Sequence, residues 1–209
     1  MNSDMDTQSG GHGNTVGATS LGGHEEVVTL SRDKGADANA QGGEYNDALY
    51  AASARGDKEL VELLLEKGAD VNAQGGLCGS ALQAASARGH EEVVALLLDK
   101  GANINTQGGE YGSALQAASA GGFKEITMLL LDKGADVNVE GGLYGNALQA
   151  ASAGGYKEIV KILLGKGAEV NVQGGEYGNA LQAALARGHG EVVTLLRDNG
   201  AEVNAQDGE

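Results

Sequence analysis

The chain has 209 residues, of which 41% are apolar and only 3% aromatic, so its core must be built from Ala, Leu and Val. A formal net charge of −15 disfavours nucleic acids and anionic membranes as partners, because both present negative charge. The single cysteine, Cys78, excludes an internal disulfide, and no stretch is apolar enough to span a membrane or resembles a signal peptide. We therefore expect a cytoplasmic or nuclear protein.

A repeated pattern runs along almost the whole chain, and Gly68 follows Gly35 by 33 residues. Four more glycines continue this period: Gly101, Gly134, Gly167 and Gly200. Asparagines keep the same period: Asn39, Asn72, Asn105, Asn138, Asn171 and Asn204. The pattern predicts a disordered tail at 1–8, six repeats at 9–41, 42–74, 75–107, 108–140, 141–173 and 174–206, and a second tail at 207–209.

The repeat at 141–173 shows the elements that each unit is expected to form. Gly141 and Gly142 begin a turn, because glycine takes positive φ angles without steric cost. Asn146 then caps a short helix of small residues, which ends at the glycine pair 154–155. A second helix from about Lys157 carries one apolar stripe, formed by Ile159, Ile162 and Leu163. One helix pair cannot bury its own apolar face, so we expect all-α units stacked in a row.

Two segments of the repeat resemble ankyrin repeats: His90-Glu91-Glu92-Val93-Val94, and the ending Gly68-Ala69-Asp70-Val71-Asn72. The resemblance covers residues 9–206 and implies an ankyrin-repeat solenoid of stacked helix-turn-helix units with short hairpin-like turns. Where the family has Thr-Pro-Leu-His, this chain has Asn-Ala-Leu-Gln at 146–149, a version similar to arrays of filamentous fungi. The inter-repeat hydrogen bonds of that histidine are then expected to fall to Gln83, Gln116, Gln149 and Gln182.

The two terminal repeats differ from the central ones. In repeat 1, Gly17 interrupts the first helix and weakens it by about 1 kcal/mol relative to Ala. Arg32 and Arg197 stand where the central repeats have leucine, so the terminal units are expected to expose polar outer faces. We interpret them as caps of a complete protein; the alternative is that repeat 1 is a decaying unit without a role.

No residue pattern indicates catalysis, a cofactor or a metal ion. His24, His90 and His189 share one repeat position but lie in different units, which disfavours a metal site. The recurring glutamates, such as Glu92, suit the first turn of each second helix, where the helix dipole favours an acid. Cys78 has no Cys or His neighbour at ligand spacing and is expected to be a surface thiol. We therefore predict that the protein is not an enzyme.

The turn tips are the predicted partner-binding surface. They alternate acid and leucine: Glu44, Leu77, Glu110, Leu143 and Glu176. Beside them lie Tyr45, Tyr111, Tyr144 and Tyr177, and the first helices end in Arg55, Arg88 and Arg187. Tyrosine offers a large contact area with few rotatable bonds, although it could equally pack between neighbouring turns, and the arginines could simply solvate the helix ends. The glycine pairs 121–122 and 154–155 are expected to leave a bare patch for a partner.

These features favour a monomeric, non-catalytic scaffold that binds another protein through a concave face. Its net charge suggests a partner with a basic or mixed-charge surface. The resemblance to fungal arrays implies a regulatory adaptor, similar to a transcription co-regulator. Two alternatives are a detached ligand-sensing array of a larger NLR-type or STAND-type receptor, and an enzyme with a shallow site, for which we find no cluster of nonrepeating polar residues.

Overall fold

The computed structural model describes residues 47–202, which fall into two compact units divided between Asn103 and Ile104. The predicted first repeat with Arg32, both tails, and the tip residues Glu44 and Tyr45 lie outside the described residues. Each unit is made of consecutive helix pairs, as the 33-residue period predicts.

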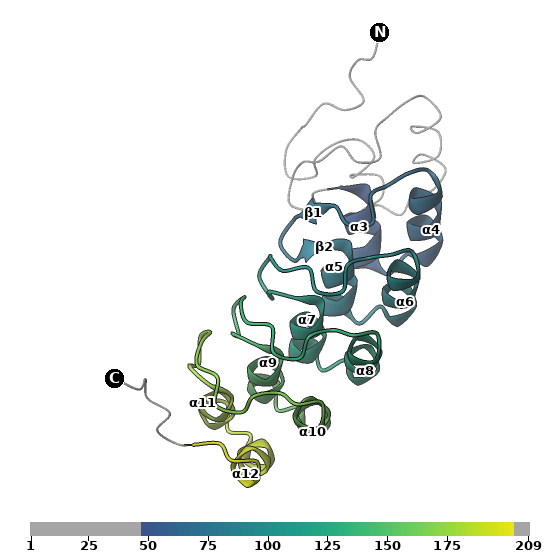
Figure 1. Cartoon of the computed structure of the whole chain (residues 1–209). Coiled ribbons are helices and arrows are strands. Elements are labelled where there is room, and N and C mark those ends of the chain that lie inside the picture. Colours follow the sequence, from purple (N-terminus) through teal and green to yellow (C-terminus); the bar gives the residue numbers. More distant parts are fainter. Residues whose placement is uncertain (1–46, 203–209) are drawn as a thin grey trace. The chain divides into compact units, whose positions relative to one another are not determined.

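The order of short helix, turn and second helix is confirmed in every described repeat, and the turn before the first helix is confirmed in the repeats that begin at residue 75 or later. The first unit contains α3 (Ala48–Arg55), α4 (Lys58–Glu66), α5 (Ala81–Arg88) and α6 (Glu91–Asp99). The second contains α7 (Ala114–Gly121), α8 (Lys124–Asp132), α9 (Ala147–Gly154), α10 (Lys157–Gly165), α11 (Ala180–Ala186) and α12 (Gly190–Asp198). In the second unit α7, α9 and α11 form one row and α8, α10 and α12 a second row beside it (Figure 1).

Hairpin-like turns precede the first helices, as expected. In the first unit, β1 (Gln74–Gly75) pairs antiparallel with β2 (Gly79–Ser80). In the second unit each turn keeps a single antiparallel bridge, such as that between Gly141 and Gly145. Gly142 must be glycine, because its φ is 63° and a Cβ would collide with the backbone of Tyr111 in the preceding turn. Successive turns of this unit therefore stack backbone against backbone.

The predicted N-caps of the first helices are confirmed. Each cap side chain accepts a hydrogen bond from the backbone N–H three residues later, at 2.7 Å for Asp47 and 2.8 Å for Asn146. Ser80, Ser113 and Asn179 act in the same way. Such caps stabilise a helix by about 1 kcal/mol each, which matters for helices of only two turns. These short helices are thus specified locally before they pack.

The core lies within and between the two rows of helices. The first helices bury the leucine of one repeat position, from Leu49 to Leu181, and neighbouring first helices pack on one another: α3 on α5, α7 on α9, and α9 on α11. The second helices completely bury the leucine at one shared repeat position: Leu64, Leu97, Leu130, Leu163 and Leu196. The predicted stripe is wrong in one detail, because α10 buries Val160 with Ile159 and Leu163 and leaves Ile162 only half-buried.

Glutamines link neighbouring repeats at two of the expected positions. Gln116 Nε2 donates to the carbonyl oxygens of Gly141 and Gly145 at 2.8 and 3.1 Å. Gln149 Nε2 donates to the equivalent carbonyls in the next turn, Gly174 and Gly178, at 3.1 and 2.9 Å. The expectation fails for Gln182, which is exposed and whose side chain donates to no residue among 47–202, since no further described repeat follows it.

The outer face of the last described repeat is only partly polar. Arg197 is exposed, as a polar face requires. Leu185, however, is 47% exposed, although it occupies the position at which Ser53, Ser86, Ser119 and Ser152 are fully buried. Within the described residues, no further first helix covers this side of α11, so its leucine stays in contact with solvent.

Candidate functional site

Three predicted tip residues form a hydrogen-bonded row in the second unit. The backbone N–H of Leu143 donates to the Glu110 carbonyl oxygen at 2.8 Å, and the N–H of Glu176 donates to the Leu143 carbonyl oxygen at 2.9 Å. All three side chains are exposed, and Leu143 is 42% exposed despite being apolar. The backbone thus holds an acid, a leucine and an acid in fixed order; we call these three residues the tip row.

The tyrosines beside the tip row are half-buried. Burial raises the pKa of the Tyr144 phenol, and the charges of Tyr177, Glu176 and Glu110 raise it further, whereas Arg187 lowers it. These groups from three turns therefore lie within electrostatic range of one phenol. Tyr111 is also half-buried. Partial burial means that each ring packs within the unit and still presents an edge to solvent, so the partner-binding role stays a prediction.

Arg187 is fixed by the tyrosine of its own repeat. Its Nε and Nη2 donate to the Tyr177 hydroxyl oxygen at 3.0 and 2.6 Å, and its guanidinium carbon lies 5.5 Å from the centre of that ring. The hydrogen bond to Tyr177 raises the pKa of the guanidinium, with smaller contributions from the charges nearby. The structure therefore brings together Tyr144, Tyr177 and Arg187 beside the tip row.

The first unit has a different turn. Leu77 is 57% exposed at the tip, but Cys78 is buried, so the expectation of a surface thiol is wrong. The cause is Tyr50, which replaces the glutamine of the other first helices and whose hydroxyl accepts a hydrogen bond from the Cys78 N–H at 3.1 Å. Burial is the largest cause that raises the pKa of Tyr50, and the backbone N–H of Cys78, which donates to the hydroxyl oxygen, offsets part of this rise. The ring lies against this turn, since a Cβ on Gly76 would come within 2.9 Å of its Cζ atom.

The two remaining predicted arginines lie at helix ends. Arg55 and Arg88 are exposed in the last turns of α3 and α5. Arg88 is close enough to Tyr50 for its charge to lower the pKa of that phenol slightly. In the first unit the sequence therefore predicted the exposed positions Leu77, Arg55 and Arg88. It missed Tyr50, although this residue stands at the repeat position where the other first helices have glutamine.

The expected bare glycine patch is not present. A Cβ on Gly121 would collide with the ring of Phe123, and a Cβ on Gly154 would collide with the ring of Tyr156. Tyr156 also lies over Gly122 of the preceding repeat. The aromatic residues at the starts of the second helices cover these glycines, so no partner can approach the backbone closely there.

The histidines at the same repeat position link neighbouring repeats. The Nε2 atoms of His90 and His189 lie 3.1 and 3.0 Å from the carbonyl oxygens of Ala54 and Ala153 in the preceding repeats, as for N–H donors. Among residues 47–202, no three His, Cys, Asp or Glu side chains converge as a metal site requires. No helix in the same range is long and apolar enough to cross a membrane.

A second set of inter-repeat links was missed, although the asparagine period pointed to it. Asn138 Oδ1 accepts a hydrogen bond from the Glu169 N–H at 2.9 Å, and its Nδ2 donates to the Gly167 carbonyl at 3.2 Å. Asn72, Asn105 and Asn171 bind the following repeat in the same way. The periodic asparagines therefore hold repeats together.

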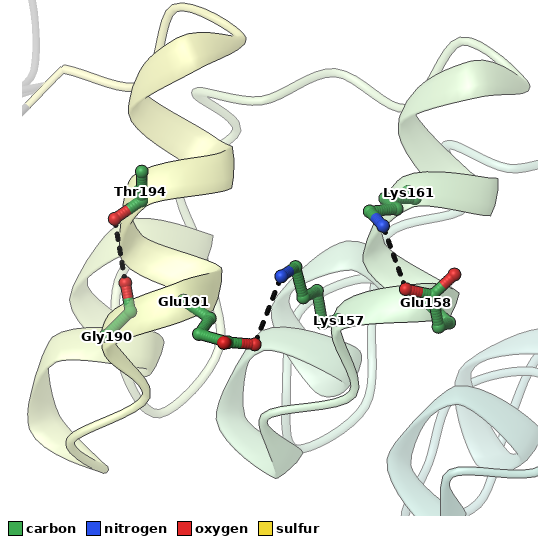
Figure 2. Close-up of polar contacts among 6 residues, drawn as sticks. All are labelled: Lys157, Glu158, Lys161, Gly190, Glu191 and Thr194. Carbon is green, nitrogen blue, oxygen red and sulfur yellow. Dashed lines mark hydrogen bonds and ion pairs between the residues drawn. The ribbon is translucent and has the colours of Figure 1, made fainter.

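The second-helix row of the second unit carries paired charges. Figure 2 shows Lys157 of α10 bound to Glu191 of α12 at 3.1 Å, and Lys161 bound to Glu158 within α10 at 2.9 Å. Lys166 likewise pairs with Asp132, which ends α8, at 2.8 Å. These exposed pairs add little stability because solvent screens them. They show, however, that acids on this face have cationic neighbours, unlike those of the tip row.

Comparison with known proteins agrees with this architecture. The family model for ankyrin repeats, described as three copies, matches residues 16–108 and again residues 114–207. A search of curated proteins finds no significant match to the chain. Ankyrin repeats generally mediate protein–protein interaction and are typically non-catalytic. Since the two matched segments span most of the sequence and contain every described helix pair, the chain belongs to the ankyrin-repeat family.

Proposed function

We propose that the protein is a non-catalytic interaction module that binds a protein partner through the second unit. The binding surface consists of the tip row together with Tyr144, Tyr177 and Arg187; we call it the tip surface. The observation that carries the proposal is the exposed Leu143, which the backbone holds in place beside two half-buried tyrosines.

The physical chemistry of this surface suits binding. Covering the exposed part of Leu143 removes apolar area from water, which favours association by roughly 25 cal/mol per Å². The hydrogen bonds between the tips and the contact between Arg187 and Tyr177 already order these side chains and their backbone. Little conformational entropy is then lost on binding, which leaves more of the contact energy as affinity.

We extend the proposal to a regulatory adaptor in the cytoplasm or nucleus. Its support is the net charge of −15, which suits basic or mixed-charge protein partners, and the one free cysteine, which suits a reducing compartment. Following a fluorescent fusion in the native cells tests the location directly, and secretion of the protein would contradict it.

Affinity capture from the native cells, quantified by mass spectrometry, tests the binding surface. We expect Leu143→Gln and Tyr144→Ala each to reduce recovery of at least one partner by about tenfold. Met128→Gln is the matched control, because Met128 has the same exposed fraction as Leu143, 42%, but lies on α8. An unchanged partner set with both tip variants, or equal loss with Met128→Gln, would contradict the proposal. Thermal melts check that each variant is folded.

A further inference from the structure

The tip row contains two carboxylates that have no cationic partner within residues 47–202. Glu110 and Glu176 are exposed, and neither side chain forms an ion pair or a hydrogen bond with any residue among 47–202. On the second-helix row, by contrast, Asp132, Glu158 and Glu191 each bind a lysine. Within the described residues the two tip carboxylates are therefore exposed and not paired with a cation, although cationic side chains are present elsewhere in the same unit.

The nearest arginine does not neutralise them. Arg187 is close enough to Glu176 for that charge to contribute to its raised pKa, yet no ion pair joins the two side chains. Its guanidinium instead donates two hydrogen bonds to the Tyr177 hydroxyl and lies over that ring. Because these contacts hold Arg187 on Tyr177, the carboxylate of Glu176 remains open to a cation from a partner.

Leu143 lies between the two acids in a fixed register. Its N–H binds the Glu110 carbonyl and its carbonyl accepts from the Glu176 N–H, so the three side chains leave neighbouring turns at equivalent positions. Next to it, the half-buried Tyr144 hydroxyl has no hydrogen-bond partner among the described residues. The surface thus offers an apolar centre, flanked by negative charge on both sides, with a free hydroxyl at its edge.

We propose that the tip surface recognises a protein segment that presents an aliphatic side chain between two basic side chains; this rests on the proposed function. The aliphatic group packs on Leu143 and the Tyr144 ring, and the two cations bind the carboxylates of Glu110 and Glu176 through charge-assisted hydrogen bonds. An acidic segment would face two unpaired carboxylates at close range. The tip acids therefore select for partner charge, while Leu143 supplies apolar contact.

Peptide titration of the full chain, followed by NMR, tests this selectivity. The probe is the synthetic peptide Gly-Arg-Leu-Arg-Gly; the comparison peptides are Gly-Glu-Leu-Glu-Gly and Gly-Arg-Gly-Arg-Gly. We expect the first to bind with the largest shift changes at the amides of Leu143, Tyr144 and Glu176. The peptide without leucine should bind at least about threefold more weakly, and the acidic peptide should not bind. Raising the salt concentration should weaken binding of the first peptide.

A charge-matched pair of variants separates local recognition from net charge. Glu110→Gln/Glu176→Gln should raise the Kd of the arginine–leucine peptide by about tenfold. Glu125→Gln/Glu169→Gln removes the same charge from exposed positions outside the tip row and should leave the Kd unchanged. Equal weakening by both pairs, binding of the acidic peptide, or shift changes confined to the second-helix row would overturn the inference.

Failure of the proposed charge selectivity can be distinguished from failure of the proposed function. If Leu143→Gln abolishes capture of a native partner while Glu110→Gln/Glu176→Gln changes neither capture nor the peptide Kd, the binding surface stands and the charge selectivity is wrong. If neither variant affects capture or peptide binding, both proposals are wrong.

Discussion

The turn at 74–80 in the first unit and the turns of the second unit are linked to the preceding repeat through different side chains. In the second unit, Gln149 donates its amide hydrogens to the carbonyls of Gly174 and Gly178 in the next turn. In the first unit, Tyr50 occupies the glutamine position, and its hydroxyl accepts a hydrogen bond from Cys78 instead. Tyr50, Gln116 and Gln149 each link this helix position to the next turn, and the residue that forms the link differs between the two units.

The consequence is a difference in surface rather than in architecture. Because the Tyr50 ring occupies the space beneath its turn, the residue beside the tip is a buried cysteine, and Leu77 stands exposed without a neighbouring tyrosine in its own turn. In the second unit, Tyr144 and Tyr177 keep that place and are half-buried. The aromatic part of the candidate surface therefore depends on which residue of the preceding repeat lies beneath the turn.

The largest expected effect is a loss of stability on replacing a buried leucine, and it should be similar in the two units. Leu97 of α6 and Leu130 of α8 are both fully buried at the same repeat position. Replacing either with alanine leaves a cavity and should lower the free energy of unfolding by roughly 2–5 kcal/mol, measured by urea denaturation. Met128→Ala on α8 is the exposed control and should have little effect. A large loss in one unit and none in the other would contradict the view that this repeat position is a core position in both units.

A smaller effect should follow from breaking each unit's own link. Gln149→Ala leaves the carbonyls of Gly174 and Gly178 without their amide donor and should cost about 1–3 kcal/mol. Tyr50→Phe removes one hydrogen bond but keeps the ring, so we expect a cost of about 1 kcal/mol. Gln182→Ala serves as the control, because Gln182 is exposed and its side chain donates to no described residue. If Gln182→Ala costs as much as Gln149→Ala, the hydrogen bonds to the next turn are not the cause.

Most of the fold could be predicted from the sequence because its signals are local. The capping side chains, such as Asn146, act on backbone atoms three residues away, and the 33-residue period gives the repeat boundaries directly. The apolar stripe of α10 was harder to predict, because Val160 and Ile162 are similar residues, and only packing against neighbouring helices decides which of them is buried.

The candidate site was predicted less completely, because the burial of its residues depends on contacts between residues at different repeat positions. Cys78 stands where the other turns have tyrosine, but the residue that binds its backbone N–H is Tyr50, in the preceding repeat. In the same way, Gly122 was expected to be bare, although Tyr156 of the next repeat covers it. The residues at equivalent repeat positions show where the sequence varies, but they do not show which side chain of a neighbouring repeat covers a given position.

The smallest expected effect is a pH dependence that differs between the two units. Burial raises the pKa of Tyr50 more than the hydrogen bond donated by the Cys78 N–H lowers it, so the folded state favours the protonated phenol. The stability that this provides is present below about pH 10, the pKa of tyrosine in an unfolded chain, and is lost as the pH rises toward the folded-state pKa. We expect the free energy of unfolding to fall above about pH 10, and Tyr50→Phe to remove more of this fall than Tyr144→Phe, because Tyr144 is only half-buried. Denaturation curves at pH values on both sides of 10 measure the difference, and identical pH profiles for the two variants would contradict the assignment of Tyr50 as the buried link of the first unit.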